Sequence, residues 1–67
     1  MKIGDKVRDK YLARMNNLKS DVFTIVDFGE KNGRELVDLE AETPNEFGDT
    51  GFWEYISELD ELITATI

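Results

Sequence analysis

The 67-residue sequence contains no cysteine and no histidine. Their absence excludes disulfides, zinc sites built on these residues, thiol nucleophiles and catalysis by a histidine base. There is also no apolar run near the roughly 18 residues of a membrane span, and residues 1–5 lack the apolar core of a signal peptide. We therefore expect a cytoplasmic protein without enzymatic activity, cofactor, metal site or membrane partner.

Cationic side chains are few and unevenly placed. The sequence has 15 carboxylates against 8 lysines and arginines, a net charge of −7. Residues 1–20 carry 6 − 2 = +4, whereas residues 21–67 carry 2 − 13 = −11. A field of this sign repels nucleic acid and attracts basic proteins. The acidic part of the chain either keeps the protein soluble or forms an interaction face.

The remaining composition, 40% hydrophobic and 34% charged, is typical of one small globular domain spanning residues 1–67. Alternating apolar and polar residues predict strands at 3–8, 22–28, 34–42 and 52–56, followed by one capped turn and a short strand at 61–63. Asn32-Gly33 predicts a tight hairpin turn between the second and third strands. Residues 43–51, with the single proline and two glycines, form a loop.

The strand patterns also predict which side chains are buried. In the third strand Val37, Leu39 and Ala41 should face inward, and Asp38, Glu40 and Glu42 outward. Apolar residues on both faces of 22–28 indicate a central strand, and we expect four residues in the core: Val26, Leu39, Ile56 and Leu59. In the fourth strand Trp53 and Tyr55 share one face, while Phe52, Glu54 and Ile56 share the other. Which set closes the core is left open.

Residues 9–21 allow two structures. Asp9 can cap a short helix in which Tyr11, Met15 and Leu18 lie on one apolar face. The polar residues of this segment equally suit an extended loop between two strands. Both alternatives remain open.

Three segments indicate the architecture of the chain. They are the opening Ile3-Gly4-Asp5-Lys6-Val7, the strand Phe23-Thr24-Ile25-Val26 and the ending Phe52-Trp53-Glu54-Tyr55-Ile56-Ser57-Glu58-Leu59. In this order the segments resemble the SH3-like small barrels, including KOW- and Tudor-type modules, over nearly the whole chain. The resemblance implies a mainly β fold, an SH3-like barrel of about five antiparallel strands. It also implies a binding module that reads peptides, nucleic acid or partner domains through its loops and one aromatic-lined face.

The preferred hypothesis is protein binding through an acidic and aromatic face. Carboxylates on rigid strands can imitate phosphates, and Trp and Tyr are common interface anchors. A basic, nucleic-acid-handling host protein is the expected partner, and an inhibitor encoded by a phage would fit the small size and negative charge. The candidate residues are Asp38, Glu40, Glu42, Glu46, Phe47, Asp49, Trp53 and Tyr55.

The alternative is a KOW-like module that binds nucleic acid through the basic N-terminal segment. Its candidate residues are Lys6, Arg8, Lys10 and Arg14. These cations can equally pair with carboxylates of their own domain, each exposed pair adding about 0–1 kcal/mol.

Overall fold

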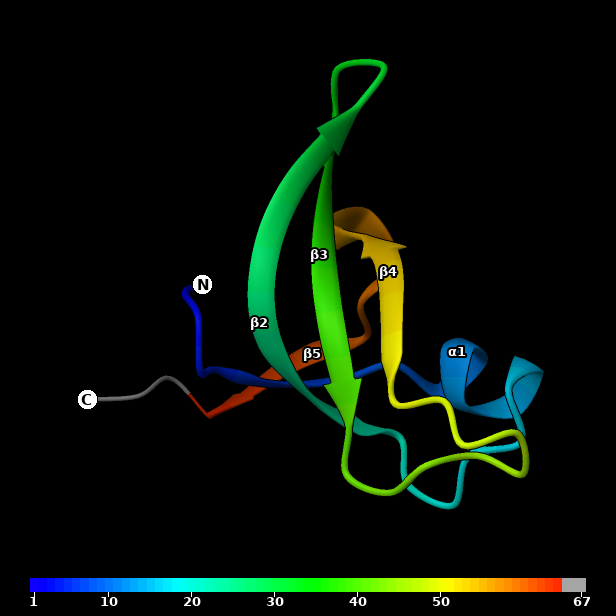
Figure 1. Cartoon of the computed structure of the whole chain (residues 1–67). Coiled ribbons are helices and arrows are strands. Elements are labelled where there is room, and N and C mark those ends of the chain that lie inside the picture. Colours follow the sequence, from blue (N-terminus) through cyan, green and yellow to red (C-terminus); the bar gives the residue numbers. More distant parts are fainter. Residues whose placement is uncertain (65–67) are drawn as a thin grey trace.

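The fold consists of five strands and two short helices, and the computed structural model describes residues 1–64 (Figure 1). In chain order the elements are β1 (Lys6–Arg8), α1 (Lys10–Met15), β2 (Val22–Lys31), β3 (Arg34–Ala41), β4 (Gly51–Tyr55), the 3₁₀ helix η1 (Ile56–Glu58) and β5 (Glu61–Thr64). None of the helices within residues 1–64 is long and apolar enough to cross a membrane.

All five strands lie in one antiparallel sheet with the order β4-β3-β2-β1-β5. The predicted mainly β fold with five antiparallel strands is therefore confirmed. The sheet curls, but it does not close into the expected barrel, because β4 and β5 are its two edges and do not pair within the described residues. These edge strands have only five and four residues, and η1 carries the chain from one edge toward the other.

The hairpin of β2 and β3 dominates the sheet and extends beyond its other strands (Figure 1). Asn32 and Gly33 connect the two strands with φ of 52° and 79°. Two consecutive positive φ angles are the signature of a type I′ turn, whose twist matches that of the flanking strands. The hairpin predicted from Asn-Gly is confirmed.

A β-bulge interrupts this hairpin. Ile25 is opposite Leu39 and Asp27 is opposite Asp38, so Val26 is the extra residue of β2. A bulge breaks the strict alternation of faces, and Val26 is 38% exposed. The expectation that Val26 belongs to the core is therefore wrong.

The core lies between the sheet and α1, which contributes Leu12 and Ala13. Its largest fully buried residues include Phe23, Ile25 and Leu39, and the buried hydrophobic residues within the described part of the chain are Val7, Leu12, Ala13, Phe23, Ile25, Val37, Leu39 and Ala41. Ile56 and Leu59 are half-buried and pack against this cluster, as does Phe52. The rings of Phe23 and Phe52 meet edge to face with centroids 6.4 Å apart. The core therefore takes Phe52 from β4 and leaves Trp53 outside.

The segment after β1 forms the short helix rather than an extended loop. Asp9 caps α1, since its Oδ1 accepts a hydrogen bond from the backbone N–H of Leu12 (3.0 Å). The predicted apolar face is wrong for Tyr11 and Met15, which are 65% and 62% exposed, and right for Leu18, which packs against the core. Leu12 and Ala13 are the buried residues of the helix. A helix of six residues has one narrow buried face, and the sheet covers the side that carries Leu12 and Ala13.

Candidate functional site

The surface of β2, β3 and β4 that faces away from the core, called here the outer face, gathers half of the predicted protein-binding residues: Asp38, Glu40, Trp53 and Tyr55. Val37 and Leu39 of β3 are buried, so alternation directs Asp38 and Glu40 to the opposite side. This confirms the predicted orientation of β3. The register places Trp53 of β4 directly opposite Asp38.

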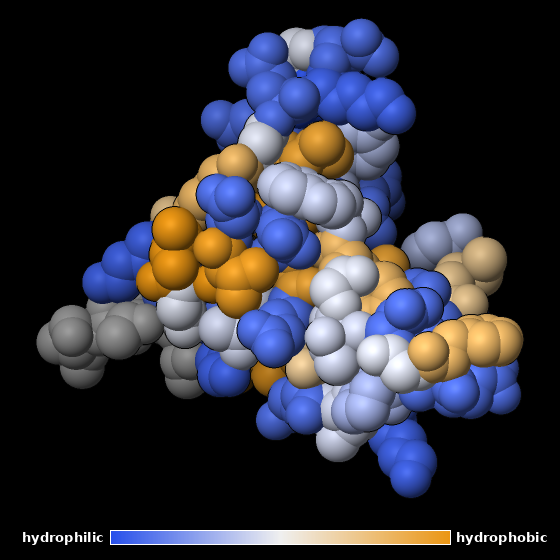
Figure 2. Space-filling model, in the orientation of Figure 1, coloured by the Kyte–Doolittle hydropathy of each residue, from blue (hydrophilic) through white to orange (hydrophobic). Residues whose placement is uncertain are grey.

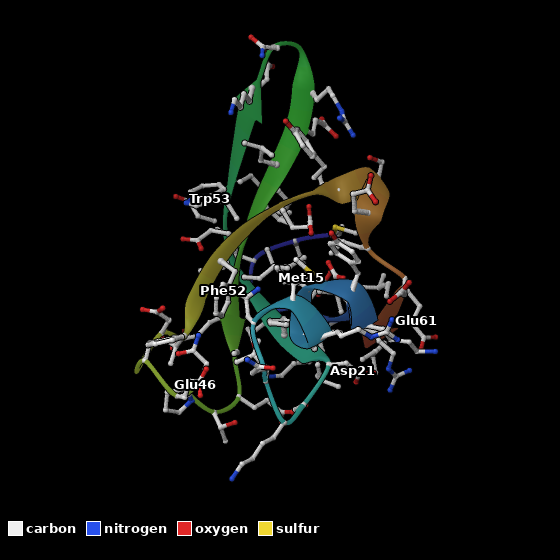
Figure 3. The ribbon with its side chains drawn as sticks, turned by 90° about the vertical axis from the view of Figure 1, so that its right-hand side faces the viewer. Met15, Asp21, Glu46, Phe52, Trp53 and Glu61 are labelled. Carbon is white, nitrogen blue, oxygen red and sulfur yellow. The ribbon has the colours of Figure 1, made fainter. Side chains whose placement is uncertain are left out.

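The indole ring of Trp53 extends over the outer face as far as β2. A Cβ added to Gly29 of β2 would come within 3.1 Å of Cζ3 of the indole ring. Because β3 separates β2 from β4, the ring reaches across the whole of β3 to rest on the glycine. The residue is still 52% exposed, and Figure 3 shows its side chain directed away from the body of the domain. Trp53 is therefore held in place with about half of its surface open to a partner.

Carboxylates without cationic partners surround Trp53. Asp27 is opposite Asp38 on one side, and Trp53 is opposite Asp38 on the other. Glu40 follows two residues along β3 on the same face, with Thr24 opposite it. Both ion pairs among residues 1–64 involve Arg8, so no lysine or arginine lies within 4 Å of these carboxylates. These carboxylates therefore take part in no ion pair among residues 1–64. Three cations nevertheless share the outer face: Lys6, bonded to Thr24 opposite Glu40, and Lys31 and Arg34 near the hairpin turn.

The acidic surface continues beyond the end of β3. Glu42 is exposed, and one of its carboxylate oxygens accepts a hydrogen bond from the hydroxyl of Ser20 (2.6 Å). Glu46 lies in the loop before β4, where its Oε1 accepts a longer bond from the side-chain amide of Asn17 (3.4 Å). These contacts fix the two glutamates to the segment that follows α1.

The loop between β3 and β4 presents Phe47 to solvent. The side-chain oxygen of Asn45 accepts hydrogen bonds from the backbone N–H groups of Phe47 and Asp49, each 2.9 Å long. Gly48 closes the turn at a φ of 84°. Phe47 is 79% exposed, and nearby Asp49 is exposed too. Phe47 therefore stands on a well-bonded turn beyond the core, although no described contact joins it to Trp53.

Tyr55 shares the outer face with Trp53 but is covered by a cation. The guanidinium carbon of Arg34 lies 3.7 Å from the centre of the Tyr55 ring. The same guanidinium donates a hydrogen bond to the hydroxyl of Ser57 (3.0 Å). A cation over the ring occupies the surface that a partner would use, so Trp53 is the more available of the two aromatic residues.

The basic N-terminal residues do not form one free cationic patch. Arg8 pairs with Asp21 at 3.3 Å and with Glu61. The hydrogen bond to Asp21 and the charges of Asp21 and Glu61 raise the pKa of Arg8 against the opposing effect of desolvation. Lys6 donates a hydrogen bond to the hydroxyl of Thr24. The predicted pairing of N-terminal cations with the acidic residues of the same domain is therefore confirmed for Arg8.

Lys10 and Arg14 are the two remaining candidates for nucleic-acid binding, and both are exposed on α1. They lie four residues apart and so share one side of the helix. The backbone N–H of Lys10 donates to the carboxylate of Asp60 (2.7 Å), which brings negative charge to the same end of the helix. Only this pair of the candidate cations is without a described side-chain partner.

Two carboxyl groups in the interior were not identified from the sequence as a pair. Asp9 is completely buried, and its second carboxylate oxygen, Oδ2, has no hydrogen-bond partner. Burial raises the pKa of Asp9, the bond from Leu12 lowers it, and the charges of Asp60 and Glu58 raise it further. Burial likewise raises the pKa of Glu54, and the neighbouring Asp9 adds to this shift through its charge and through the hydrogen bond that the two carboxyls form when one of them is protonated.

Glu54 belongs to the face of β4 that includes Phe52, which packs on the core. The alternation of β4 predicted that Glu54 shares a face with Phe52 but left open whether this face is the inner one, and the approach of Glu54 to Asp9 is a tertiary contact. Residues 1–64 contain no group of three or more acidic side chains arranged to hold a metal ion. The pair is therefore two facing carboxyls near the start of α1, without the further ligand that a metal centre needs.

Comparison with known proteins adds no relative. The chain matches no protein-family model, no curated protein sequence and no solved structure. Its function must accordingly be argued from the geometry of the outer face.

Proposed function

We propose that this protein is a non-enzymatic binding module whose outer face docks on a basic surface of another protein. One observation carries the proposal: the half-exposed Trp53 is fixed against Gly29, beside the opposed and unpaired carboxylates of Asp38 and Asp27. A rigid aromatic anchor next to uncompensated charge suits a cationic partner, because the aromatic supplies buried area and the carboxylates supply specificity and fast association.

The energetics of the sheet support this reading. Like charges directly opposite each other on neighbouring strands are destabilising, and Asp27 and Asp38 are such a pair. Glu30 and Glu35 form a second pair of opposed carboxylates nearer the hairpin turn, but only Asp27 and Asp38 lie beside Trp53. Lysine and arginine of a partner would relieve the repulsion on binding.

We propose further that the basic surface is one that its owner uses for nucleic acid, so that the module acts as an inhibitor. Grooves that bind phosphates are lined by lysine and arginine, and the carboxylates of the outer face offer the same sign of charge as phosphates. The opposed cross-strand pair and the i, i+2 spacing of Asp38 and Glu40 give this charge a regular arrangement.

The test is affinity capture from a bacterial lysate with charge-reversed variants. Asp38→Lys with Glu40→Lys should abolish capture of the basic partner. The matched control is Glu30→Lys with Glu35→Lys, which changes the net charge equally on exposed hairpin residues outside the outer face. Both variants must melt cooperatively. Equal loss of capture in both pairs would show that net charge alone attracts the partner and would contradict the proposal.

The alternative function predicts the opposite responses. If the N-terminal segment bound nucleic acid, Lys10→Glu with Arg14→Glu would abolish binding to single-stranded DNA or RNA, and reversing Asp38 and Glu40 would strengthen it. We expect the unmodified protein to bind neither nucleic acid at physiological salt, because a domain of charge −7 must first overcome repulsion. Tight, salt-sensitive binding of DNA or RNA would favour the alternative.

A further inference from the structure

β4 is an edge of the sheet, and its hydrogen-bonding pattern identifies which backbone groups point outward. The backbone N–H of Ala41 donates to the carbonyl of Thr50 at 2.7 Å. The register continues without a shift from Glu40 opposite Gly51 to Leu36 opposite Tyr55. In antiparallel pairing, hydrogen-bonded and non-hydrogen-bonded pairs alternate. Phe52 and Glu54 therefore bond to β3.

The backbone groups of Gly51, Trp53 and Tyr55 accordingly point away from β3. The N–H of Tyr55 is already satisfied, because it donates to Oε1 of Glu54 (2.9 Å). No backbone hydrogen bond from another described element reaches Gly51 or Trp53. The edge thus offers the N–H and carbonyl groups of two residues, one of which is the proposed anchor of the outer face.

Charge determines what kind of strand can occupy this edge. Glu54 directs its carboxylate to the inner side of β4, and inward-directed charges are a common protection of edges against unwanted pairing. A second copy of the chain would bring another glutamate and another −7 charge to the same edge. A strand with a lysine or arginine beside Glu54 would instead neutralise it, so the same residue rejects one occupant and favours the other.

We propose that the basic partner contributes an extended segment that pairs with the free edge of β4, next to Trp53. This inference rests on the proposed function and specifies the partner as an extended cationic strand. Backbone hydrogen bonds to Gly51 and Trp53 would give affinity, as in other cases of strand addition. Cationic side chains on the two faces of the added segment would reach Glu54 on the inner side of β4, and the Trp53 ring and Asp38 on the outer side.

The first test follows backbone amides during a titration with an end-blocked peptide in which lysine alternates with valine and threonine. Hydrogen exchange at the Trp53 and Gly51 amides should slow about tenfold or more at saturation, since a new hydrogen bond protects them. The amide of Phe52 is the internal control, because it already bonds to β3. A peptide of the same charge with alternate amides N-methylated should give no such protection.

The second test uses a matched pair of substitutions at Gly51. A Cβ there meets nothing within 4 Å, so Gly51→Ala should leave peptide affinity within about twofold, having removed no hydrogen-bonding group. Gly51→Pro removes an outward N–H without touching the β3 ladder, a position at which edge strands tolerate proline. Affinity should fall about tenfold, the equivalent of one lost hydrogen bond with added steric conflict.

The outcomes separate this inference from the proposed function. If Gly51→Pro binds like wild type and reversal of Asp38 and Glu40 abolishes binding, the partner uses the outer face and the strand-addition inference is wrong. If the peptide binds without protecting the Trp53 amide, the inference is wrong as well. Protection of Trp53 that rises with protein concentration in the absence of peptide would assign the edge to a second copy. Failure of the peptide to bind, while the basic partner is still captured through Asp38 and Glu40, would overturn the strand-addition inference alone.

Discussion

The substitution Asp9→Asn should stabilise the protein at neutral pH. Asp9 is fully buried, caps α1 through Oδ1 and leaves Oδ2 without a donor. Asparagine is as good a cap as aspartate, and its NH₂ group would replace the unsatisfied oxygen with a donor toward Glu54. An unsatisfied buried polar group costs about 1–3 kcal/mol. We therefore expect Asp9→Asn to raise the free energy of unfolding by about 1–3 kcal/mol at pH 7.

The gain should depend on pH with a definite sign. Burial, as the largest cause, raises the pKa of Asp9 and of Glu54. Between the ordinary carboxyl pKa of about 4 and these raised values, the native state binds more protons than the unfolded state. Wild-type stability contributed by the pair therefore falls as pH rises through this window. The advantage of Asp9→Asn should be small below pH of about 4 and complete above the raised values.

Thermal melts at several pH values measure this effect, since 1 kcal/mol moves the midpoint by about 4–8 °C in a domain of this size. Asp9→Ala removes the charge together with the cap, and should be less stable than Asp9→Asn by about 0.5–2 kcal/mol. Asp49→Asn controls for the loss of one exposed negative charge. An Asp9→Asn protein no more stable than wild type at pH 7, or a gain that does not vary with pH, would refute the reasoning.

Two further predictions concern the sheet. Leu39→Ala should lower the free energy of unfolding by about 2–5 kcal/mol through lost burial and a cavity. Val26→Ala, at the exposed bulge, should lower it by less than about 1 kcal/mol. Urea unfolding curves measure both losses, and equal losses would contradict the observed bulge. Asp27→Lys should stabilise the fold by about 0.2–1 kcal/mol, because the repulsion between residue 27 and Asp38 becomes an attraction. The same variant should weaken capture of the basic partner. A less stable variant in the urea assay would show that Asp27 has a structural role instead.

The parts of the fold governed by local sequence were predictable. Asn32-Gly33 adopts the two positive φ angles that its residue types favour, and this turn fixes the register of the longest hairpin. The alternation of Val37 and Leu39 with Asp38 then determines which side of β3 is buried. These features depend on neighbours within a few residues.

The features that the sequence did not predict depend on tertiary contacts. The bulge at Val26 arises from pairing with β3, and nothing in the run of apolar residues around it distinguishes it from Ile25. The exposure of Tyr11 and Met15 follows from how α1 sits on the sheet. The failure of the sheet to close depends on the positions of its two edges.

The sequence predicted the residues of the candidate site but only part of their arrangement in space. The alternation of β3 predicted that Asp38 and Glu40 face outward, whereas the face taken by Trp53 was left open and is decided by the packing of Phe52 on the core. Contact of Trp53 with Gly29 and the opposition of Asp27 to Asp38 both require the register of three strands.

Figure 2 shows a different feature, apolar atoms gathered on the side of the N-terminal segment and β2, where Met1, Ile3, Val26 and Phe28 are exposed.

The most direct test of the central claim uses the single tryptophan of the chain. Protein labelled with 5-fluorotryptophan gives one fluorine resonance, and that resonance reports on Trp53 alone, whatever tryptophans the partner contains. On addition of the captured basic partner, we expect the resonance to shift and to lose its sensitivity to solvent isotope. The same change should be absent with the Asp38→Lys, Glu40→Lys variant. A complex that forms while the Trp53 resonance stays unchanged would contradict the claim that the outer face is the binding surface.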